Sequence, residues 1–205
     1  MMRVAGLVLA GGRSRRLGRP KQLLMLDGVP LVRHVVGRAL AAGLDEIVVV
    51  TGAHAEPVRD ALAGLPVRWV HNERHAEGMG TSLAAGVGAM GRDIDAVVVL
   101  LADQPTVDPG AIRRAVSARR QRRVPLVMAR YGTARGHPVL FGRELFPELR
   151  ALVGDRGGRE VVRAHEPALV LVDGGADEPP LDVDTEADWA ALQAAWHDGR
   201  DGARR

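Results

Sequence analysis

Short apolar runs alternate along the chain with segments of helical periodicity, and this alternation limits the possible folds more than any other feature. The runs at 46–51 (EIVVVT) and 96–101 (AVVVLL) are continuous and rich in β-branched residues, which is typical of strands covered on both faces. A similar apolar run occupies residues 4–10. Apolar residues at helical spacing occur at 30–42, 80–90 and 109–122. Strands that alternate with helices predict a three-layer α/β fold with a mostly parallel sheet.

The remaining segments extend the same pattern over a chain of 205 residues. We expect further strands at 67–71, 124–129 and 168–172, and helices at 57–63, 143–152, 159–164 and 185–196. Glycine and proline interrupt the segment 131–141, which we interpret as a lid or a hairpin. A chain of this length suits one domain, placed at 1–196, and the polar residues 197–205 are expected to form a disordered tail.

A loop rich in glycine and arginine follows the first predicted strand, with the sequence GGRSRRLGRPK from Gly11 to Lys21. Glycines let the backbone turn its N–H groups toward a ligand, and cationic side chains add positive charge, so the loop predicts a phosphate site. Its spacing differs from that of a Walker A loop, and Pro20 disfavours the helix into which a Rossmann fingerprint runs. Lys21 is the only lysine in a chain with many arginines. A compact ammonium differs chemically from a planar guanidinium.

Polar residues also follow other predicted strands, as Asn72 and Asp103 do, and Asp184 follows later in the chain. Because ligands of parallel sheets bind beyond the carboxyl ends of the strands, we expect these residues near the Gly11–Lys21 loop. Carboxylates beside a phosphate site indicate a Mg²⁺–nucleotide site. Asp103 could instead be a turn residue, and Asp184 could equally cap the last predicted helix.

Two further segments have a structural and a functional interpretation each. In the turn GMGTSL at 78–83, Ser82 could bind a flat base, or Thr81 or Ser82 could cap the following helix. The basic run from Arg113 to Arg123 could bind nucleic acid, but with 3% aromatic residues for base stacking we favour a solvated helix face.

Composition excludes several classes of function. The chain has no cysteine, so it has no disulfide, no thiolate nucleophile and no cysteine-ligated metal. The net charge of +3 gives little support for nucleic acid as a partner. No apolar run reaches the roughly 18 residues of a membrane span, and no signal peptide is apparent. We expect a cytoplasmic protein that binds neither nucleic acid nor membrane.

Six motifs together resemble the nucleotidyltransferases of molybdenum cofactor maturation, specifically the molybdopterin cytidylyltransferase-like branch. The resemblance covers about residues 4–192 and keeps the order of motifs in that family. The motifs are LAGGRSRRLGRPK (9–21), GMGTSLAAG (78–86), LLADQP (100–105), GHPVLF (136–141), GDRGGREVV (154–162) and DVDTEAD (182–188), with Asn72 before the second.

The resemblance implies a Rossmann-like nucleotidyltransferase fold and assigns site residues. The implied nucleotide-binding residues are Leu9, Ala10, Gly11, Gly12, Arg16, Lys21, Asn72, Gly80, Ser82 and Asp103. Arg16, Lys21 and Asp103 would be catalytic, and Asp103 and Asp184 would bind Mg²⁺. The region 136–158, with His137 and Asp155, would face a pterin phosphate, although a histidine in such a position is more often an ordinary loop residue.

Members of this family transfer CMP from CTP, or GMP from GTP, to the phosphate of molybdopterin and release pyrophosphate. The resemblance therefore implies a Mg²⁺-dependent cytidylyltransferase. It also implies a further partner, a molybdoenzyme that would receive the product. The segments 80–83 and 101–105 resemble the cytidylyl branch, whereas Gly11-Gly12 stands where that branch commonly has Ala-Gly and is more typical of the guanylyl branch. The alternatives are transfer from GTP, another phosphorylated acceptor, and a non-catalytic chaperone that binds nucleotide or pterin and inserts cofactor.

Overall fold

A seven-stranded sheet forms the centre of the computed structural model, which describes residues 2–155 and 157–202, with side chains described up to residue 197. The strand order is β5-β4-β1-β6-β8-β7-β9, and only β8 runs antiparallel to its neighbours. The strands are β1 (Val4–Ala10), β4 (Glu46–Thr51), β5 (Arg68–His71), β6 (Ala96–Leu101), β7 (Leu126–Tyr131), β8 (Ala134–Gly142) and β9 (Leu169–Asp173). A separate hairpin pairs β2 (Met25–Leu26) with β3 (Val29–Pro30).

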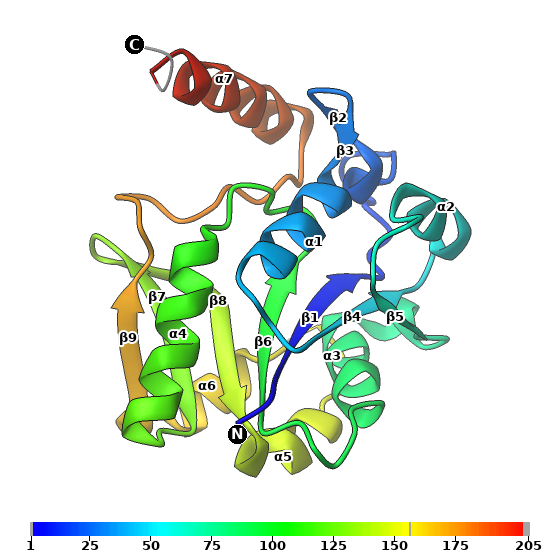
Figure 1. The fold of residues 1–205 in the computed structure, drawn as a ribbon. Coiled ribbons are helices and arrows are strands. Elements are labelled where there is room, and N and C mark those ends of the chain that lie inside the picture. Colours follow the sequence, from blue (N-terminus) through cyan, green and yellow to red (C-terminus); the bar gives the residue numbers. More distant parts are fainter. Residues whose placement is uncertain (1, 156, 203–205) are drawn as a thin grey trace.

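Helices cover both faces of the sheet, which confirms the predicted three-layer α/β fold (Figure 1). One face carries α1 (Leu31–Ala41), α2 (Ala55–Ala61) and α4 (Pro109–Arg122). The other carries α3 (Met79–Gly88), α5 (Phe146–Arg150) and α6 (Arg159–Ala164). The side chains of β1 alternate between the two cores: Val8 packs with the α1 face and Leu7 with the α3 face. A strand that is buried on both faces explains the continuous apolar runs in the sequence.

The segment after α4 forms an antiparallel hairpin of β7 and β8, which resolves the choice between lid and hairpin. Gly132, with a φ of 55°, forms the turn between the two strands. The predicted strand at 124–129 and helix at 143–152 occur with shifted bounds, at β7 and at a 3₁₀ turn (Arg143–Leu145) followed by α5. Such shifts are common because backbone hydrogen bonds, not apolar residues, define the ends of an element.

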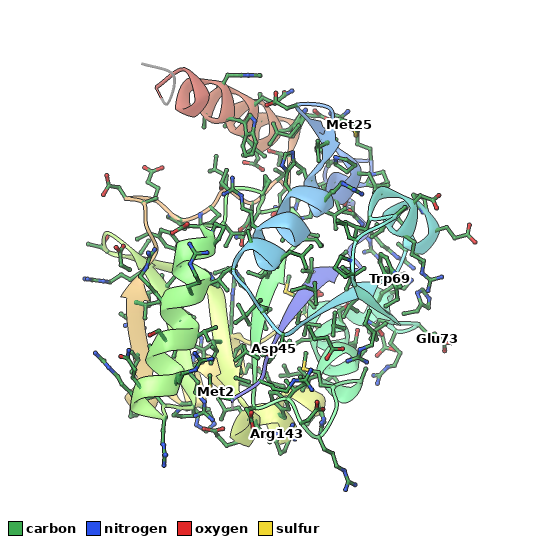
Figure 2. The ribbon with its side chains drawn as sticks, in the orientation of Figure 1. Met2, Met25, Asp45, Trp69, Glu73 and Arg143 are labelled. Carbon is green, nitrogen blue, oxygen red and sulfur yellow. The ribbon has the colours of Figure 1, made fainter. Side chains whose placement is uncertain are left out.

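The last helix, α7 (Glu186–Gly202), lies above the carboxyl edge of the sheet and packs against the β2–β3 hairpin (Figure 1). Figure 2 shows Met25, a largely exposed residue, on this hairpin next to α7. Residues 197–202 continue the helix, although the sequence predicted a disordered tail from residue 197; residues 203–205 lie outside the described residues. Adding residues to a helix that packing has already nucleated costs little free energy.

A third, small apolar core joins α7 to the rest of the protein. Val183, which is fully buried, belongs to the extended strap of residues 174–185 that leads from β9 to α7. Trp196 packs at the edge of this core and donates a hydrogen bond from Nε1 to Asp27 Oδ2 at 2.8 Å. The buried members of this core are Leu17, Leu24, Leu26, Leu31, Val183, Trp189 and Leu192. The strap and the loop after β1 are therefore held together by apolar contacts.

Within residues 2–155 and 157–202, no helix is both long enough and apolar enough to cross a membrane.

Replacing Asp108 by Ala is expected to lower the free energy of unfolding by about 1 kcal/mol at neutral pH, because Asp108 caps α4. Its carboxylate accepts hydrogen bonds from the backbone N–H groups of Gly110 and Ala111. Burial raises the pKa of Asp108, but these bonds and Arg114 outweigh burial and hold that pKa below its usual value. A lowered pKa stabilises the fold above about pH 4.

Urea unfolding between pH 7 and pH 2 measures this contribution. The difference between wild type and Asp108→Ala should disappear as the pH falls below 4 through the lowered pKa of Asp108. Asp60→Ala, at an exposed position of α2, serves as a control and should change little at any pH. A difference that stays constant down to pH 2 would contradict the capping role.

Candidate functional site

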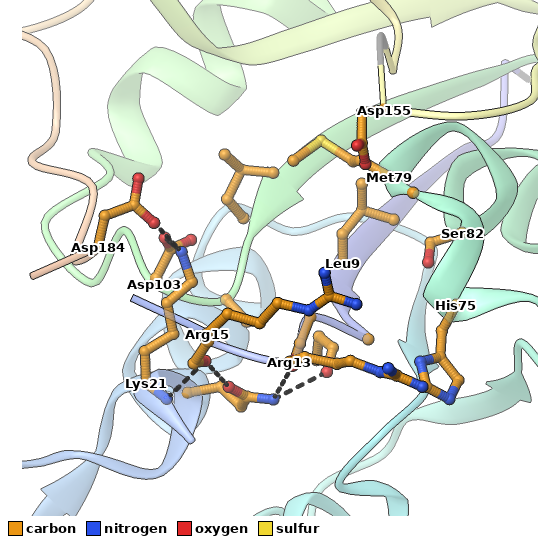
Figure 3. A pocket seen from close by; sticks show the side chains of 18 of the residues that line it. Leu9, Arg13, Arg15, Lys21, His75, Met79, Ser82, Asp103, Asp155 and Asp184 are labelled. Carbon is orange, nitrogen blue, oxygen red and sulfur yellow. Dashed lines mark hydrogen bonds and ion pairs between the residues drawn. The ribbon is translucent and has the colours of Figure 1, made fainter. Parts of the chain in front are cut away.

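A cavity of about 520 Å³ opens at the carboxyl ends of β1 and β6 (Figure 3). The glycine- and arginine-rich loop after β1 forms one side of it, and the strap before α7 closes another. Of the predicted site residues, the cavity brings together Leu9, Ala10, Gly11, Gly12, Arg16, Lys21, Ser82, Asp103, Asp155 and Asp184. Side chains from segments more than 160 residues apart thus meet at the edge of the sheet where parallel α/β folds bind ligands.

Internal hydrogen bonds fix the shape of the loop after β1. Ser14 has a φ of 52°, and its hydroxyl accepts a hydrogen bond from the Lys21 N–H at 3.0 Å. Gln22, only 2% exposed, donates from Nε2 to the carbonyl oxygens of Ala10 and Gly12 at 3.2 and 3.3 Å. These contacts occupy carbonyl groups of the loop, so the loop is preorganised for a ligand.

Lys21 lies between two carboxylates at the floor of the cavity, as Figure 3 shows. Its Nζ atom is 2.5 Å from Asp103 Oδ2 and 2.8 Å from Asp184 Oδ1. Arg16 contributes a second cation, with its Nη2 atom 2.5 Å from Asp184 Oδ2. Asp103 is buried, whereas the Asp184 side chain is one-third exposed. The chain's only lysine thus links a carboxylate after β6 to one on the strap.

The protonation states of Lys21, Asp103 and Asp184 depend on one another. Burial raises the pKa of Asp103, and the Lys21 ammonium opposes this effect. Burial alone would lower the pKa of Lys21, but Asp103 and Asp184 raise it above its usual value, so Lys21 stays protonated. Burial raises the pKa of Asp184 as well, but Lys21 and Arg16 outweigh it, so that this pKa lies below the usual range. Asp184 is therefore ionised at neutral pH.

The structure excludes one of the two interpretations of Asp184, the helix cap. The residues that cap α7 are Thr185 and Asp188: Asp188 Oδ2 accepts from the Thr185 N–H at 2.8 Å, and Thr185 Oγ1 accepts from the Asp188 N–H at 3.2 Å. This reciprocal pair is a capping box. The Asp184 carboxylate instead contacts Lys21 and Arg16 in the cavity. Asp184 is thus a residue of the cavity and not the helix cap.

The carboxylates of Asp103 and Asp184 are compatible with a divalent cation that is bound together with phosphate. Among the residues that the structure describes, no cluster of three or more histidine, aspartate or glutamate side chains could hold a metal ion alone. Mg²⁺ commonly binds one or two carboxylates and takes its other ligands from substrate phosphates and water. Asp103 and Asp184 both contact one cation already, the Lys21 ammonium, so their oxygens converge on a cation-binding position.

The opposite end of the cavity has small and apolar residues that suit a nucleobase. A Cβ atom added at Gly11 would lie 3.1 Å from Ser82 Oγ, whereas one at Gly12 would have no neighbour within 4 Å. Figure 3 shows Met79 and Ser82 from α3 on this side, with His75 beside Arg13. Because Gly11 has no side chain, a flat ring can approach the backbone here.

Two predicted nucleotide-binding residues lie behind the cavity wall. The buried Asn72 side chain donates from Nδ2 to Thr81 Oγ1 and Ser82 Oγ at 2.8 and 3.0 Å, so it orients Ser82. The Gly80 N–H donates to the Gly154 carbonyl oxygen at 2.8 Å, and this bond joins α3 to the loop that carries Asp155. Both residues therefore support the wall, and neither lines the cavity.

A second cavity of about 620 Å³ adjoins the first and contains His137. Asp155, Arg159 and Asp182 line both cavities, so the two are continuous. Burial lowers the pKa of His137 to about 4, with Asp182 opposing and Arg159 reinforcing the shift. The imidazole is therefore neutral at physiological pH and cannot serve as a cation there.

Several polar residues of the two cavities were not predicted. Gln22 could have been noticed as a polar residue within the apolar run QLLML, and Asp182 lies in the motif DVDTEAD two residues before Asp184. Gln104 and Arg159 gave no signal of their own, because their roles depend on pairing across the tertiary fold. The additional polar residues are Arg13, Ser14, Arg15, Gln22, His75, Gln104, Arg135, Arg159, Arg163, Glu166 and Asp182.

Comparison with known proteins relates this arrangement to a family. The profile of the MobA-like NTP transferase domain matches residues 6–169, which excludes the strap and α7. The chain is 34% identical to nicotine blue oxidoreductase of Paenarthrobacter nicotinovorans, over 89% of this chain and 92% of that protein. It is 30% identical to the molybdenum cofactor guanylyltransferase of Rhodobacter capsulatus, over 89% of this chain and 86% of that protein.

Solved structures agree with these sequence relationships. The structure of Rv0371c from Mycobacterium tuberculosis H37Rv in complex with manganese matches with a TM-score of 0.80 and 31% identity, over 94% of this chain and 98% of that chain. The fold is thus shared over nearly the whole length, in a relative whose structure contains a divalent metal.

Proposed function

The chain belongs to the MobA-like NTP transferase domain family and is a nucleotidyltransferase; from this premise we propose that it transfers CMP from CTP to the phosphate of molybdopterin. The observation that carries the proposal is the junction of two cavities. One combines a cationic loop with paired carboxylates, and the other is largely apolar. A triphosphate and a phosphorylated planar acceptor would meet where the cavities join.

In the proposed reaction, an oxygen of the acceptor phosphate attacks the α-phosphorus of the nucleotide. The new P–O bond forms as the bond to the bridging oxygen breaks, and pyrophosphate leaves with the electron pair. Lys21, Arg16 and the N–H groups of the loop after β1 would bind the β- and γ-phosphates and stabilise the charge on the leaving group. No protein nucleophile is needed, which agrees with a chain that has no cysteine.

Asp103 and Asp184 would hold the divalent cation in this proposal. When bound, such a cation neutralises phosphate charge and fixes the orientation of the α-phosphate. Lys21 then has to exchange its carboxylate partners for phosphate oxygens, a change that preserves the charge balance around its ammonium. Mg²⁺ is proposed as the physiological ion because it readily binds through few carboxylates together with phosphate.

The proposed use of CTP predicts a measurable preference among nucleotides. With molybdopterin and Mg²⁺, pyrophosphate release is expected to be about tenfold or more faster from CTP than from GTP, since a base pocket that pairs with one base leaves polar groups unpaired with the other. The segments 80–83 and 101–105 support CTP. Pyrophosphate release with each of the four nucleotides tests the preference, and reactions without molybdopterin are the control.

Three outcomes would redirect this assignment. A preference for GTP would favour the second candidate, guanylyl transfer, which the Gly11-Gly12 pair and the Rhodobacter relative support. Tight binding of nucleotide or pterin without release of pyrophosphate would instead indicate a chaperone that inserts cofactor into a molybdoenzyme. Consumption of NAD(P)H without nucleotide transfer would point to a redox activity, as in the name of the Paenarthrobacter relative.

A further inference from the structure

Gln104 has an unusual hydrogen-bonding state in the wall of the second cavity. It is 5% exposed, and its Nε2 donates to Asp182 Oδ1 at 2.7 Å. Its Oε1 is buried and accepts no hydrogen bond from the residues that the structure describes. A carboxylate can only accept, so Asp182 fixes which end of the amide faces it and leaves Oε1 as the free acceptor. A buried acceptor without a partner destabilises the protein until a donor arrives.

The surroundings of Gln104 limit which molecule can supply that donor. Apolar side chains from β6, β8 and α3 line the same cavity, which suits the faces of an aromatic ring better than a sugar with hydroxyl groups on both faces. These apolar residues include Leu83, Val99, Val139 and Phe141. Polar and charged side chains line the rest of this cavity, and they are Gln104, Arg135, His137, Asp155, Arg159, Arg163, Glu166 and Asp182. A planar ligand with a polar edge therefore matches the cavity.

The charges indicate where an anionic group of the ligand would lie. Arg159 lines both cavities, so it stands at their junction, where an acceptor phosphate has to reach the nucleotide. Asp182, also at the junction, accepts through Oδ1 from Gln104 Nε2. The Gln104 amide oxygen and the Asp182 carboxylate are thus acceptors on two paired side chains, and two such acceptors complement a ring edge that presents two N–H donors.

We propose that Gln104, oriented by Asp182, recognises the donor edge of a planar nitrogen heterocycle, with a ring N–H and an exocyclic amino group, that carries a phosphate toward Arg159. Gln104 is thus a specificity-determining residue for the acceptor and not for the nucleotide. The proposal rests on the proposed function for the direction of the phosphate, but binding of the heterocycle itself does not depend on catalysis.

A binding experiment on the intact chain tests this role. 6-(Hydroxymethyl)pterin phosphate is titrated into the protein and followed by its fluorescence, and CTP binding with Mg²⁺ is measured by calorimetry. Gln104→Met should weaken pterin binding on the order of tenfold, because a hydrogen bond to a buried acceptor is lost, while CTP affinity stays unchanged. The matched control Gln121→Met changes an exposed glutamine on α4 and should affect neither ligand.

A second measurement changes the ligand and keeps the wild-type protein. With wild-type protein, a pterin analogue whose exocyclic amino group is dimethylated should bind about tenfold more weakly, since it lacks those donors. Equal pterin binding by Gln104→Met and wild type, an equal loss of CTP affinity, or binding of glucose 1-phosphate in place of pterin would each overturn the proposal. Gln104-dependent pterin binding without nucleotidyl transfer would uphold it and refute the proposed function.

Discussion

Replacing Asp103 by Asn is expected to reduce kcat for nucleotidyl transfer by about a thousandfold, because the neutral amide removes the buried carboxylate proposed to hold the divalent cation. The change is isosteric, and Lys21 keeps its second partner, Asp184, at 2.8 Å, so the fold should persist. Steady-state pyrophosphate release measures the loss of activity. Binding of Mn²⁺ in the presence of CTP, followed by electron paramagnetic resonance, provides a readout independent of turnover and should weaken in parallel.

Asp108→Asn is the matched control for this substitution. Asp108 lies on the same connection between β6 and α4, but it caps α4 and lines neither cavity. Asparagine is also a good capping residue, so the control should keep full activity and nearly full stability. Wild-type turnover in Asp103→Asn, or unchanged Mn²⁺ binding, would remove Asp103 from the metal site.

Lys21→Met is expected to lower kcat/KM by about a hundredfold or more, because the substitution removes the ammonium proposed to stabilise the departing pyrophosphate. It should also destabilise the fold by about 2 kcal/mol, since Asp103 is left buried without its cation. Steady-state kinetics and urea unfolding measure the two effects separately. Lys21→Arg keeps the charge but replaces a compact ammonium by a planar group, so it should restore stability better than activity.

Arg19→Met tests whether the effect is specific to position 21. Arg19 belongs to the same loop, but its guanidinium pairs with Glu186 at the surface and does not line the cavity. Removing an exposed ion pair costs about 0.5 kcal/mol or less and should leave turnover unchanged. Similar losses of activity in Arg19→Met and Lys21→Met would indicate that only the overall charge of the loop matters.

The layers of the fold were predictable from sequence because their cause is local. Continuous β-branched runs such as 46–51 and 96–101 form strands only when both faces are covered, and the structure confirms these two strands with the predicted bounds. The antiparallel direction of β8 was left open, because the turn at Gly132 fits a lid as well as a hairpin. Strand pairing depends on partners distant in sequence, which periodicity does not report.

The candidate site was predictable where residues directly follow strands, as at Asp103 and in the loop from Gly11. The roles proposed for these side chains stay predictions, but most of them line one cavity. The sequence could not separate Asp184 from a helix cap, because Thr185 and Asp188 complete the capping box only once α7 has formed. Gln104 belongs to the motif LLADQP, but it was given no role of its own for a similar reason, since its partner Asp182 is 78 residues away.

The buried side chain of Val183 couples the docking of α7 to the positions of two carboxylates in the cavities. Val183 separates Asp182, which pairs with Gln104, from Asp184, which pairs with Lys21. Because these carboxylates reach the cavities only while Val183 stays in the small core with Trp189 and Leu192, undocking of α7 withdraws both together. Since Asp184 is proposed to hold the divalent cation and Asp182 to orient Gln104, we expect the concentration of competent enzyme to follow the local opening equilibrium of the C-terminal helix, at a free energy below that of global unfolding.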